Sequence, residues 1–409
     1  MSMTLEQVEA LLPDFQYVDG DDIVVTVAFA ASFYFWGGHT AAKRQALADC
    51  FEAFVAAYGQ ELRWFFDEED HEELDLTRKA LPSIRQYIQR MDEDDTVAWF
   101  CTSGTESTAG DYEISCFTER GWMNGEISGL RFHVPRSVVF DAASQKALSD
   151  LVHLCLERLA PFQANAGFAA VSTYEEYKWE PEELDLATRY LALYTDSRVY
   201  DPMQAAHGIK GVNWLTFVSD VLCERVGGPQ AFEQYCQRFG ITPQRWGQGY
   251  IVLAGDLPEL GPVTEPPPEA YVKANAALRP LRNGSFGSMG MGSMDGELHF
   301  DRCTSDLWIR RFDAPGIWPP ASLIGLGKKP LGGKPAERVK LKTGETCAVH
   351  GRYRDPADDA DDENAFCVVL LPGDIAPYRS QLGPHGEYQG RKAIAWELAA
   401  ELSSPSDRS

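Results

Sequence analysis

The sequence IVVTVAFAASFYFWGG at residues 23–38 is a long apolar stretch, and it is the part of the chain that decides the expected fold. It is rich in Val, Ala, Phe and Tyr, which pack well on a pleated surface, and it ends on the pair Gly37-Gly38. The stretch is too short to cross a bilayer as a helix. We therefore expect a buried strand over Ile23–Trp36 that leaves into a turn at the two glycines.

An amphipathic helix is predicted directly after this turn. Thr40 has a side chain suited to capping a helix N-terminus, and Gly59 is placed to end the helix. The apolar residues between them recur at spacings of three and four, which puts them on one face: Leu47, Phe51, Phe54, Val55 and Tyr58. A strand, a turn and a helix thus form the first expected unit of the fold.

Further along the chain, strand patterns and helix patterns both occur. Short stretches bounded by Gly, Ser or Asp predict strands over Thr96–Thr102, Tyr112–Phe117 and Gly129–Val134. Helical spacing of apolar residues predicts helices over 142–159, Glu182–Tyr194 and Leu215–Val226. The expected class is α+β, a mixed or antiparallel sheet with packed amphipathic helices, plus a small β-rich C-terminal domain.

The domain boundaries are predicted from shifts in composition in the last third of the chain. Pro262–Pro268 holds four prolines in seven residues, and Gly284–Gly296 is rich in Gly, Ser and Met. A basic stretch rich in Gly and Pro follows at 325–334. We expect an α+β domain over residues 1–314, a linker over 315–336 and a small β-rich domain over 337–409.

The chain is strongly acidic, with 61 Asp and Glu against 37 Lys and Arg and a formal net charge of -24. Nucleic acids and anionic membranes repel such a surface, so we expect neither to bind directly. A basic protein partner is the natural complement, although an acidic surface also simply aids solubility. The sequence leaves the oligomeric state open.

The expected localisation is cytoplasmic. The first residues, MSMTLEQVEALLPDF, contain acidic side chains and lack the basic region and apolar run of a secretory signal. Elsewhere, no stretch approaches the roughly 18–20 uninterrupted apolar residues that a membrane-spanning helix needs.

Motifs for catalysis or metal binding are weak in this sequence. The nine cysteines include no Cys-x-x-Cys element, and the eight histidines include neither His-Glu-x-x-His nor His-x-His. The run Gly290–Gly296 lacks the spacing of a phosphate-binding loop, and no Gly-x-Ser-x-Gly element occurs. We expect no catalytic residue, metal or cofactor. A hydrolytic enzyme remains an alternative if His39 or His207 meets two carboxylates in a pocket.

Two dense acidic runs are the candidate partner-binding residues. The first run contains Asp67, Glu68, Glu69, Asp70, Glu72, Glu73 and Asp75. The second run, some sixteen residues further on, contains Asp92, Glu93, Asp94 and Asp95. Such density is typical of a solvated loop, and equally of a docking patch that steers an electropositive partner and mimics a polyanion.

A third acidic group differs because aromatic side chains are interleaved with its carboxylates. Its candidate residues are Glu175, Glu176, Tyr177 and Trp179. Aromatic residues beside charged ones are typical of binding hot spots. The same aromatics could instead belong to the core, and the sequence does not decide between the two.

Several stretches resemble one known family. They are Phe33–Phe35, Lys43–Leu47 with Cys50-Phe51, Gly208–Phe217 and Trp308–Asp313. In kind, order and separation they resemble the type VI secretion immunity family, formerly a domain of unknown function, over roughly residues 15–314. The tail, with Thr343–Cys347, Gly351–Tyr353, Pro372–Asp374 and Trp396–Leu398, resembles a small β-rich module appended to other immunity proteins.

The resemblance implies a function without catalysis. Proteins of this family are encoded beside toxic effectors delivered by type VI secretion, including nucleases, and neutralise them by binding. It implies a cognate effector toxin as the partner, with its active or substrate-binding surface covered by this chain. A scaffold that binds several partners is the remaining non-enzymatic alternative.

Overall fold

The computed structural model describes residues 4–11, 15–123, 127–197, 204–284, 286–290, 299–320, 323, 340–349, 351–357, 367–382 and 388–401. The chain forms two compact units. The first unit contains Met1–Glu175, Ala192–Leu260 and Pro268–Asn283, and the second contains Glu176–Leu191, Gly261–Pro267 and Gly284–Ser409.

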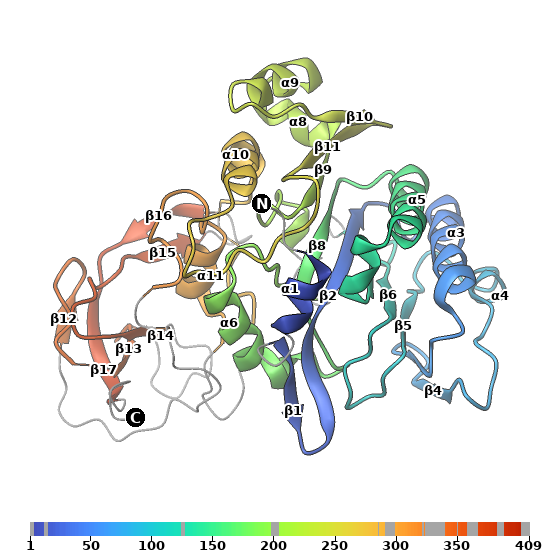
Figure 1. Ribbon diagram of the computed structural model, residues 1–409, viewed down its shortest axis with the longest axis horizontal. Helices are drawn as coiled ribbons and strands as arrows, with labels where there is room; N and C mark the ends of the chain where they lie inside the picture. The colour runs from blue at the N-terminus through green and yellow to red at the C-terminus, as the bar shows by residue number, and fades with distance from the viewer. Residues whose placement is uncertain are drawn as a thin grey trace. The chain divides into compact units, whose positions relative to one another are not determined.

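The first unit is built around an antiparallel sheet of eleven strands (Figure 1). Ten strands follow the order β10-β11-β9-β8-β2-β7-β6-β5-β3-β4, and β1 also pairs with β2. The strands are β1 (Tyr17–Asp19), β2 (Asp22–Phe35), β3 (Trp64–Asp67), β4 (Glu72–Asp75), β5 (Ala98–Thr102), β6 (Glu113–Phe117), β7 (Ser128–Val134), β8 (Gln163–Ser172), β9 (Leu215–Ser219), β10 (Gln244–Trp246) and β11 (Gly249–Leu253). The strand expected over Ile23–Trp36 is confirmed as β2.

Strand β2 is buried because both of its faces are covered. On one face Phe33 packs against Phe132 of the neighbouring strand β7, and Phe54 of helix α3 (Ala41–Tyr58) covers Phe132 with ring centroids 5.5 Å apart. On the other face the hydroxyls of Ser32 and Tyr34 donate to the carboxylate of Asp196, the Tyr34 bond measuring 2.9 Å. An apolar run with few interruptions is what a strand in this position requires.

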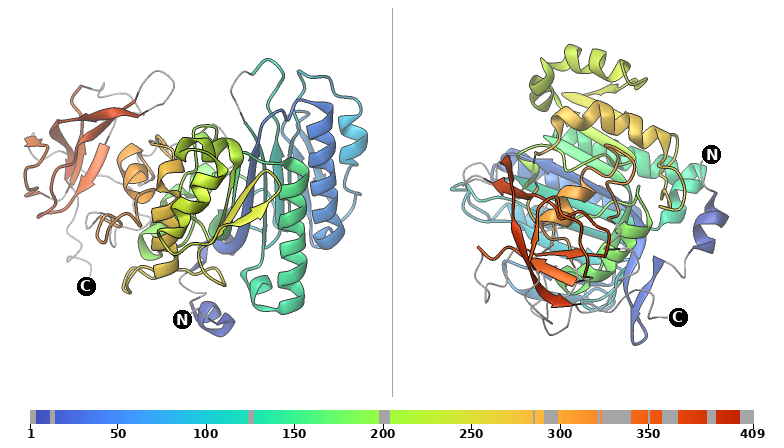
Figure 2. Two further views of the ribbon diagram at one scale, coloured as in Figure 1. Left: turned by 90° about the horizontal axis from the view of Figure 1, so that it is seen from above. Right: turned by 90° about the vertical axis from the view of Figure 1, so that its left-hand side faces the viewer.

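Two long helices of the first unit, α3 (Ala41–Tyr58) and α5 (Ala142–Leu159), pack against each other and beside the sheet (Figure 2, left, blue and green). Thr40 caps α3 as predicted, accepting from the Lys43 N–H at 3.3 Å, and α3 ends at Gly59. Among the described residues, this unit also holds the helices α1 (Leu5–Ala10), α4 (Ile84–Ile88), α8 (Asp220–Cys223), α9 (Pro229–Gln237), α10 (Glu269–Leu278), and the 3-10 turns η1 (Arg136–Phe140), η3 (Glu224–Val226) and η4 (Arg279–Leu281).

The helix predicted over Leu215–Val226 is wrong. Leu215–Ser219 forms β9 between β8 and β11, and only the residues after it turn into the short α8 and η3. Thr216 and Val218 are β-branched and suit a strand, and Ser219 then caps α8 by accepting from the Leu222 N–H. Pairing on both sides therefore overrides the helical spacing of the apolar residues.

In the described residues of the second unit, the elements are two α-helices, one 3-10 turn and a small β-rich part. They are η2 (Glu176–Trp179), α6 (Glu180–Arg189), α11 (Arg302–Trp308), β12 (Lys340–Lys342), β13 (Gly351–Arg354), β14 (Cys367–Leu370), β15 (Arg379–Leu382), β16 (Tyr388–Lys392) and β17 (Ala395–Glu401). Helix α6 ends earlier than the predicted Tyr194, because Tyr190 is extended and the Leu191 N–H bonds instead to the Gly261 carbonyl.

The tail motifs form the core of this β-rich part. Its sheet has the order β12-β17-β13-β14, and β15 pairs with β16. Trp396 and Tyr353 are fully buried, and the Tyr353 hydroxyl donates to the Val349 carbonyl at 2.8 Å beside Cys347. The predicted class is confirmed: an α+β fold with a small β-rich C-terminal part.

The expected domain boundaries at 314 and 336 stay a prediction. Most of the expected linker at 315–336, and residues 285 and 291–298 of the Gly, Ser and Met-rich run, lie outside the described residues. In the described ranges, none of the helices is both long enough and apolar enough to cross a membrane.

Candidate functional site

The first acidic run lies at one edge of the large sheet, on the hairpin formed by β3 and β4. Glu68, Glu69 and Asp70 occupy the turn and are exposed, as are the strand residues Glu72, Glu73 and Asp75. The Glu73 carboxylate accepts from the Trp64 indole N–H at 2.8 Å, across the pair of strands. The hairpin therefore presents several carboxylates to solvent from a paired, ordered backbone.

Asp67 differs from the rest of the run and corrects the expectation that all of it faces solvent. Its side chain is only 2% exposed, and it accepts from the Trp99 indole N–H at 2.9 Å and from the Glu69 N–H at 3.0 Å. Burial raises the pKa of this carboxyl, while the hydrogen bonds lower it. Asp67 therefore holds the hairpin turn and is removed from the candidate docking surface.

The second acidic run is a loop whose backbone is held by a buried arginine. The guanidinium of the buried Arg44 donates to the backbone carbonyls of Asp92 and Asp95, at 2.5 and 2.6 Å. Asp92, Glu93 and Asp94 are exposed, whereas Asp95 is half-buried. The anchored backbone turns the first three carboxylates outward.

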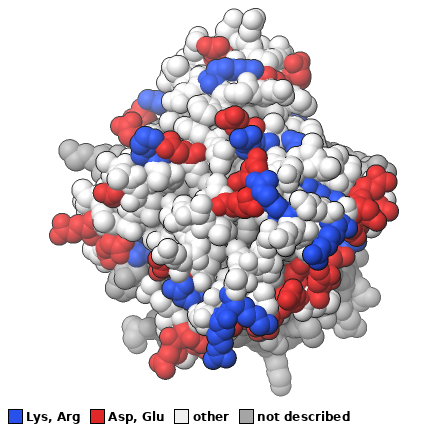
Figure 3. Space-filling model, turned by 90° about the vertical axis from the view of Figure 1, so that its right-hand side faces the viewer, with Lys and Arg blue, Asp and Glu red and all other residues white. Residues whose placement is uncertain are grey.

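Arg120 joins the two runs into one surface. Its Nη2 atom contacts both carboxylate oxygens of Glu69, at 2.8 and 2.7 Å, and its Nη1 atom donates to the Asp94 carbonyl at 3.0 Å. We call the joined patch the acidic surface, and it consists of Glu68, Glu69, Asp70, Glu72, Glu73, Asp75, Asp92, Glu93 and Asp94. On the face shown in Figure 3, acidic side chains likewise occur in groups, separated by Lys, Arg and uncharged residues.

Trp122 is a candidate that sequence reasoning missed. It is 62% exposed, and the neighbouring Gly121 N–H bonds to the Glu93 carbonyl at 2.7 Å, so it lies at the border of the acidic surface. An exposed tryptophan beside carboxylates suits a binding anchor. A single aromatic residue in a turn gives no periodic signal, so the sequence could not single it out.

The third acidic group begins beside the β3–β4 hairpin, because Tyr174, directly before Glu175, packs on Phe66 with ring centroids 5.2 Å apart. Glu175 ends one stretch of the first unit, and Glu176, Tyr177 and Trp179 form η2 at the start of the second. Tyr177 is 42% exposed, and Trp179 is half-buried. A role for these four residues in partner binding stays a prediction.

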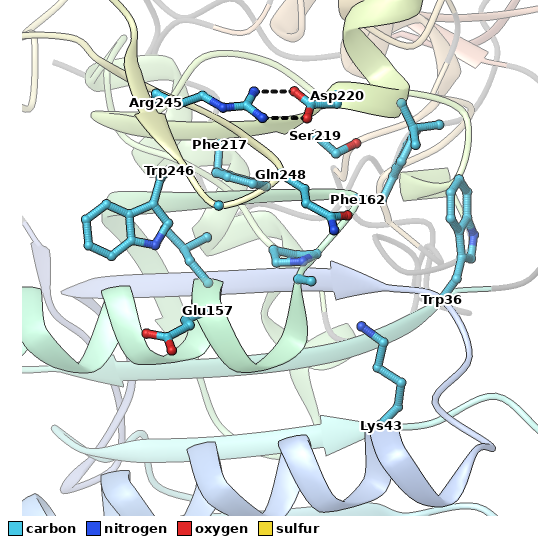
Figure 4. A pocket seen from close by; sticks show the side chains of 15 residues that line it. Trp36, Lys43, Glu157, Phe162, Phe217, Ser219, Asp220, Arg245, Trp246 and Gln248 are labelled. Atoms are coloured by element: carbon cyan, nitrogen blue, oxygen red, sulfur yellow. Dashed lines mark hydrogen bonds and ion pairs between the residues drawn. The ribbon is translucent and has the colours of Figure 1, made fainter. Parts of the chain in front are cut away.

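A groove of about 760 Å³ lies in the first unit, near the other edge of the sheet. Four segments line it: the β10–β11 hairpin, the β9–α8 junction, the C-terminal end of α5 with Phe162, and Trp36 with Lys43. Figure 4 shows Trp36 and Trp246 at its two ends, Lys43 and Glu157 on one side, and Arg245 and Asp220 on the other. We call this feature the groove.

Aromatic stacking fixes the walls of the groove. Trp36 packs on Phe162 with ring centroids 4.3 Å apart, and Trp246 stacks on His153 at 4.1 Å and 19°. Burial lowers the pKa of His153 below its usual value, which favours the neutral ring in this stack. Gly249 of β11 lets the β10–β11 hairpin lie close to β9, because a Cβ at this position would lie 2.4 Å from the ring of Phe217 on β9.

The hydrolytic alternative depends on the surroundings of His39 and His207. The His39 Nδ1 atom lies 3.3 Å from one carboxylate oxygen of Glu119, which also accepts from the Gly38 N–H at 2.7 Å. His207 is exposed on the surface. The described residues place one carboxylate against His39, where the alternative requires two, and in the same residues no three His, Cys, Asp or Glu side chains gather as a metal site would require.

Comparison with solved structures shows a known protein that shares this fold. The fold is similar to that of the Pseudomonas aeruginosa T6SS protein PA0821, with a TM-score of 0.64 and 27% sequence identity over 71% of this chain and 83% of that chain. The fold is thus shared with a protein of a type VI secretion system. A search of curated protein sequences gave no match.

The family itself is given by the sequence. The family described as type VI immunity for VRR-NUC matches residues 46–312, which is well over half of the chain. The chain belongs to this family. The resemblance drawn from Gly208–Phe217 and Trp308–Asp313 is confirmed.

Proposed function

We propose that this protein binds a cognate VRR-NUC nuclease effector and neutralises it by covering the surface with which the nuclease holds its substrate. The family supports an immunity role. The observation that carries the mechanism is the acidic surface, in which Arg120 joins two carboxylate runs into one patch. A nuclease presents Lys and Arg to bind phosphates, so an ordered cluster of carboxylates is complementary to that surface.

This mechanism requires no catalytic residue in the chain itself. A protein that covers an active surface needs a large interface and buried anchors, and Trp122 at the border of the acidic surface supplies an exposed aromatic side chain for this purpose. Because the substrate of the effector is nucleic acid, protection is needed where that nucleic acid lies. We therefore infer that the protein acts in the cytoplasm.

Production of the effector in a bacterial host tests this function. The effector alone should stop growth, and joint production of this protein should restore growth and allow the two to be purified together. An effector whose nuclease site has been inactivated is the control, since it should bind the protein without harming the cell. Failure to restore growth at equal protein levels, with no complex recovered, would contradict the proposal.

A further inference from the structure

We propose that the groove is a second contact site for the nuclease effector, and that it takes a segment in which a large apolar side chain stands next to a Lys or Arg. This inference rests on the proposed function and names a further surface on which the same partner docks. The groove is lined in part by the β10–β11 hairpin, at the opposite edge of the sheet from β4.

The apolar half of this recognition comes from exposed side chains that line a concave surface. Trp36 is 42% exposed and Val221 is 62% exposed, although both are large hydrophobic residues and both line the groove. A volume of about 760 Å³ accommodates one or two large side chains with their backbone. Concave sites lined by aromatic residues are where binding energy concentrates in protein interfaces.

The groove is already shaped before any partner arrives. The stack of Trp246 on His153 holds one end, and that of Trp36 on Phe162 holds the other. The hairpin is tied down as well, because Arg245 and Asp220 form a two-point ion pair whose Nη2–Oδ2 contact measures 2.7 Å. When the walls of a site are already fixed, little binding free energy is lost to ordering side chains.

The charges around the groove determine what stands next to the apolar side chain. Arg245 is neutralised by Asp220, and Lys43 donates to the Leu159 carbonyl at the C-terminal end of α5. The helix terminus carries partial negative charge, so it compensates this cation in part. Glu157 is exposed and has no ion pair within the described part of the chain, so the groove selects a cation beside the apolar group.

The groove reaches the acidic surface at helix α3. Lys43 lines the groove, and the next residue, Arg44, donates to the Asp92 carbonyl in the second acidic run. Trp36 lies close by in sequence to Gly38, whose N–H bonds to the Glu119 carboxylate next to Arg120. One continuous face of the effector can therefore contact both sites within a standard-size interface.

The test measures association and dissociation rates between the immobilised effector and variants of the full chain. Val221→Arg fills the groove and adds a positive charge, and Trp36→Ala removes its exposed aromatic wall. We expect either variant to dissociate about ten-fold faster or more. Glu157→Lys should weaken binding by about three- to five-fold, because it places like charge against the cation.

Matched controls lie at the far end of β2. Val18 is 56% exposed and pairs with Ile23, so Val18→Arg makes the same change as Val221→Arg on a comparable valine. Glu106 is exposed in a loop whose Ala109 N–H bonds to the Ile23 carbonyl, so Glu106→Lys matches Glu157→Lys. Both controls should bind the effector like the wild type. The two controls, as well as Val221→Arg and Glu157→Lys, should keep the wild-type melting temperature to within about 2 °C.

Each outcome decides the proposal. Groove variants that bind like the wild type would overturn the groove as a docking site, while the proposed function would stand on wild-type binding. A wild-type chain that fails to bind the effector would instead contradict the proposed function. If Val221→Arg changes the oligomeric state of the free protein in light scattering, a second copy of the chain is the occupant and the inference is wrong.

Discussion

The two edges of the large sheet differ in how they can hold a partner. At the β4 edge, exposed carboxylates gather around Arg120, so the attraction acts over a long range and weakens with salt. Around the β10–β11 hairpin at the other edge, the charges are mostly compensated, and stacked aromatics line a groove. Contacts of that kind act only at short range. The first edge should therefore set how fast the complex forms, and the second how long it lasts.

The largest expected effect is a loss of stability when Asp67, which holds the β3–β4 hairpin, is replaced. Asp67→Ala leaves the buried Trp99 N–H without its acceptor, so we expect a loss of about 2–3 kcal/mol in the free energy of unfolding. Urea denaturation measures this loss. Asp67→Asn keeps an acceptor and should lose clearly less, and the exposed Glu68→Ala should lose almost nothing. Equal stability of Asp67→Ala and the wild type would show that Asp67 does not hold this edge.

The next effect separates the two edges by kinetics. Reversing Glu68, Asp70 and Glu72 to Lys should lower the association rate about ten-fold at low ionic strength, while the dissociation rate changes little. Stopped-flow mixing with the effector at low and high salt measures both. The control reverses three exposed carboxylates at the β1–β2 turn, Asp19, Asp21 and Asp22. If both triple variants slow association equally, overall charge and not the acidic surface steers the partner.

A smaller effect is expected from Trp122, which places an aromatic side chain at the acidic edge and could therefore slow dissociation there as well. We expect Trp122→Ala to raise the dissociation rate about five-fold and to leave stability unchanged, because the side chain is 62% exposed in the free protein. Surface plasmon resonance and thermal denaturation measure the two quantities. A loss of stability with unchanged binding would make Trp122 a structural residue.

The smallest effect is a pH dependence confined to the groove edge. Burial lowers the pKa of His153 in the folded state, so the unfolded chain takes up its proton first as the pH falls. The free energy of unfolding should therefore decrease as the pH drops through about 6.5. His153→Gln removes this contribution, so its stability relative to the wild type should rise from pH 7.5 to pH 5.5 in urea denaturation. Parallel pH profiles would contradict the lowered pKa.

Local patterns predicted the parts of the fold that depend on local sequence. Strand β2 and helices α3 and α5 follow from an apolar run and from regular spacing, and the structure places them within a residue or two of the expected ends. The spacing of Leu215, Val218 and Leu222 fits a helix, whereas the structure has a strand over Leu215–Ser219 and a short helix that holds only Leu222 of the three. Pairing with β8 and β11 decided between them, and the sequence alone does not contain that information.

The candidate site was predicted in composition but not in geometry. Both acidic runs are visible as sequence, yet the residue that joins them, Arg120, lies 51 positions from Glu69. The burial of Asp67 depends on Trp99, which is 32 positions away on β5. The groove needs four segments brought together by the sheet and α5. No local pattern signals such assemblies.

The central claim is that the protein neutralises a VRR-NUC nuclease effector by binding it, and a titration of nuclease activity tests this claim most directly. Purified protein is added in steps to a fixed amount of the effector, and cleavage of nucleic acid is measured at each step. Tight binding over the active surface predicts that activity falls linearly and reaches zero at a single equivalent. Undiminished cleavage in the presence of about ten-fold excess protein would contradict the account.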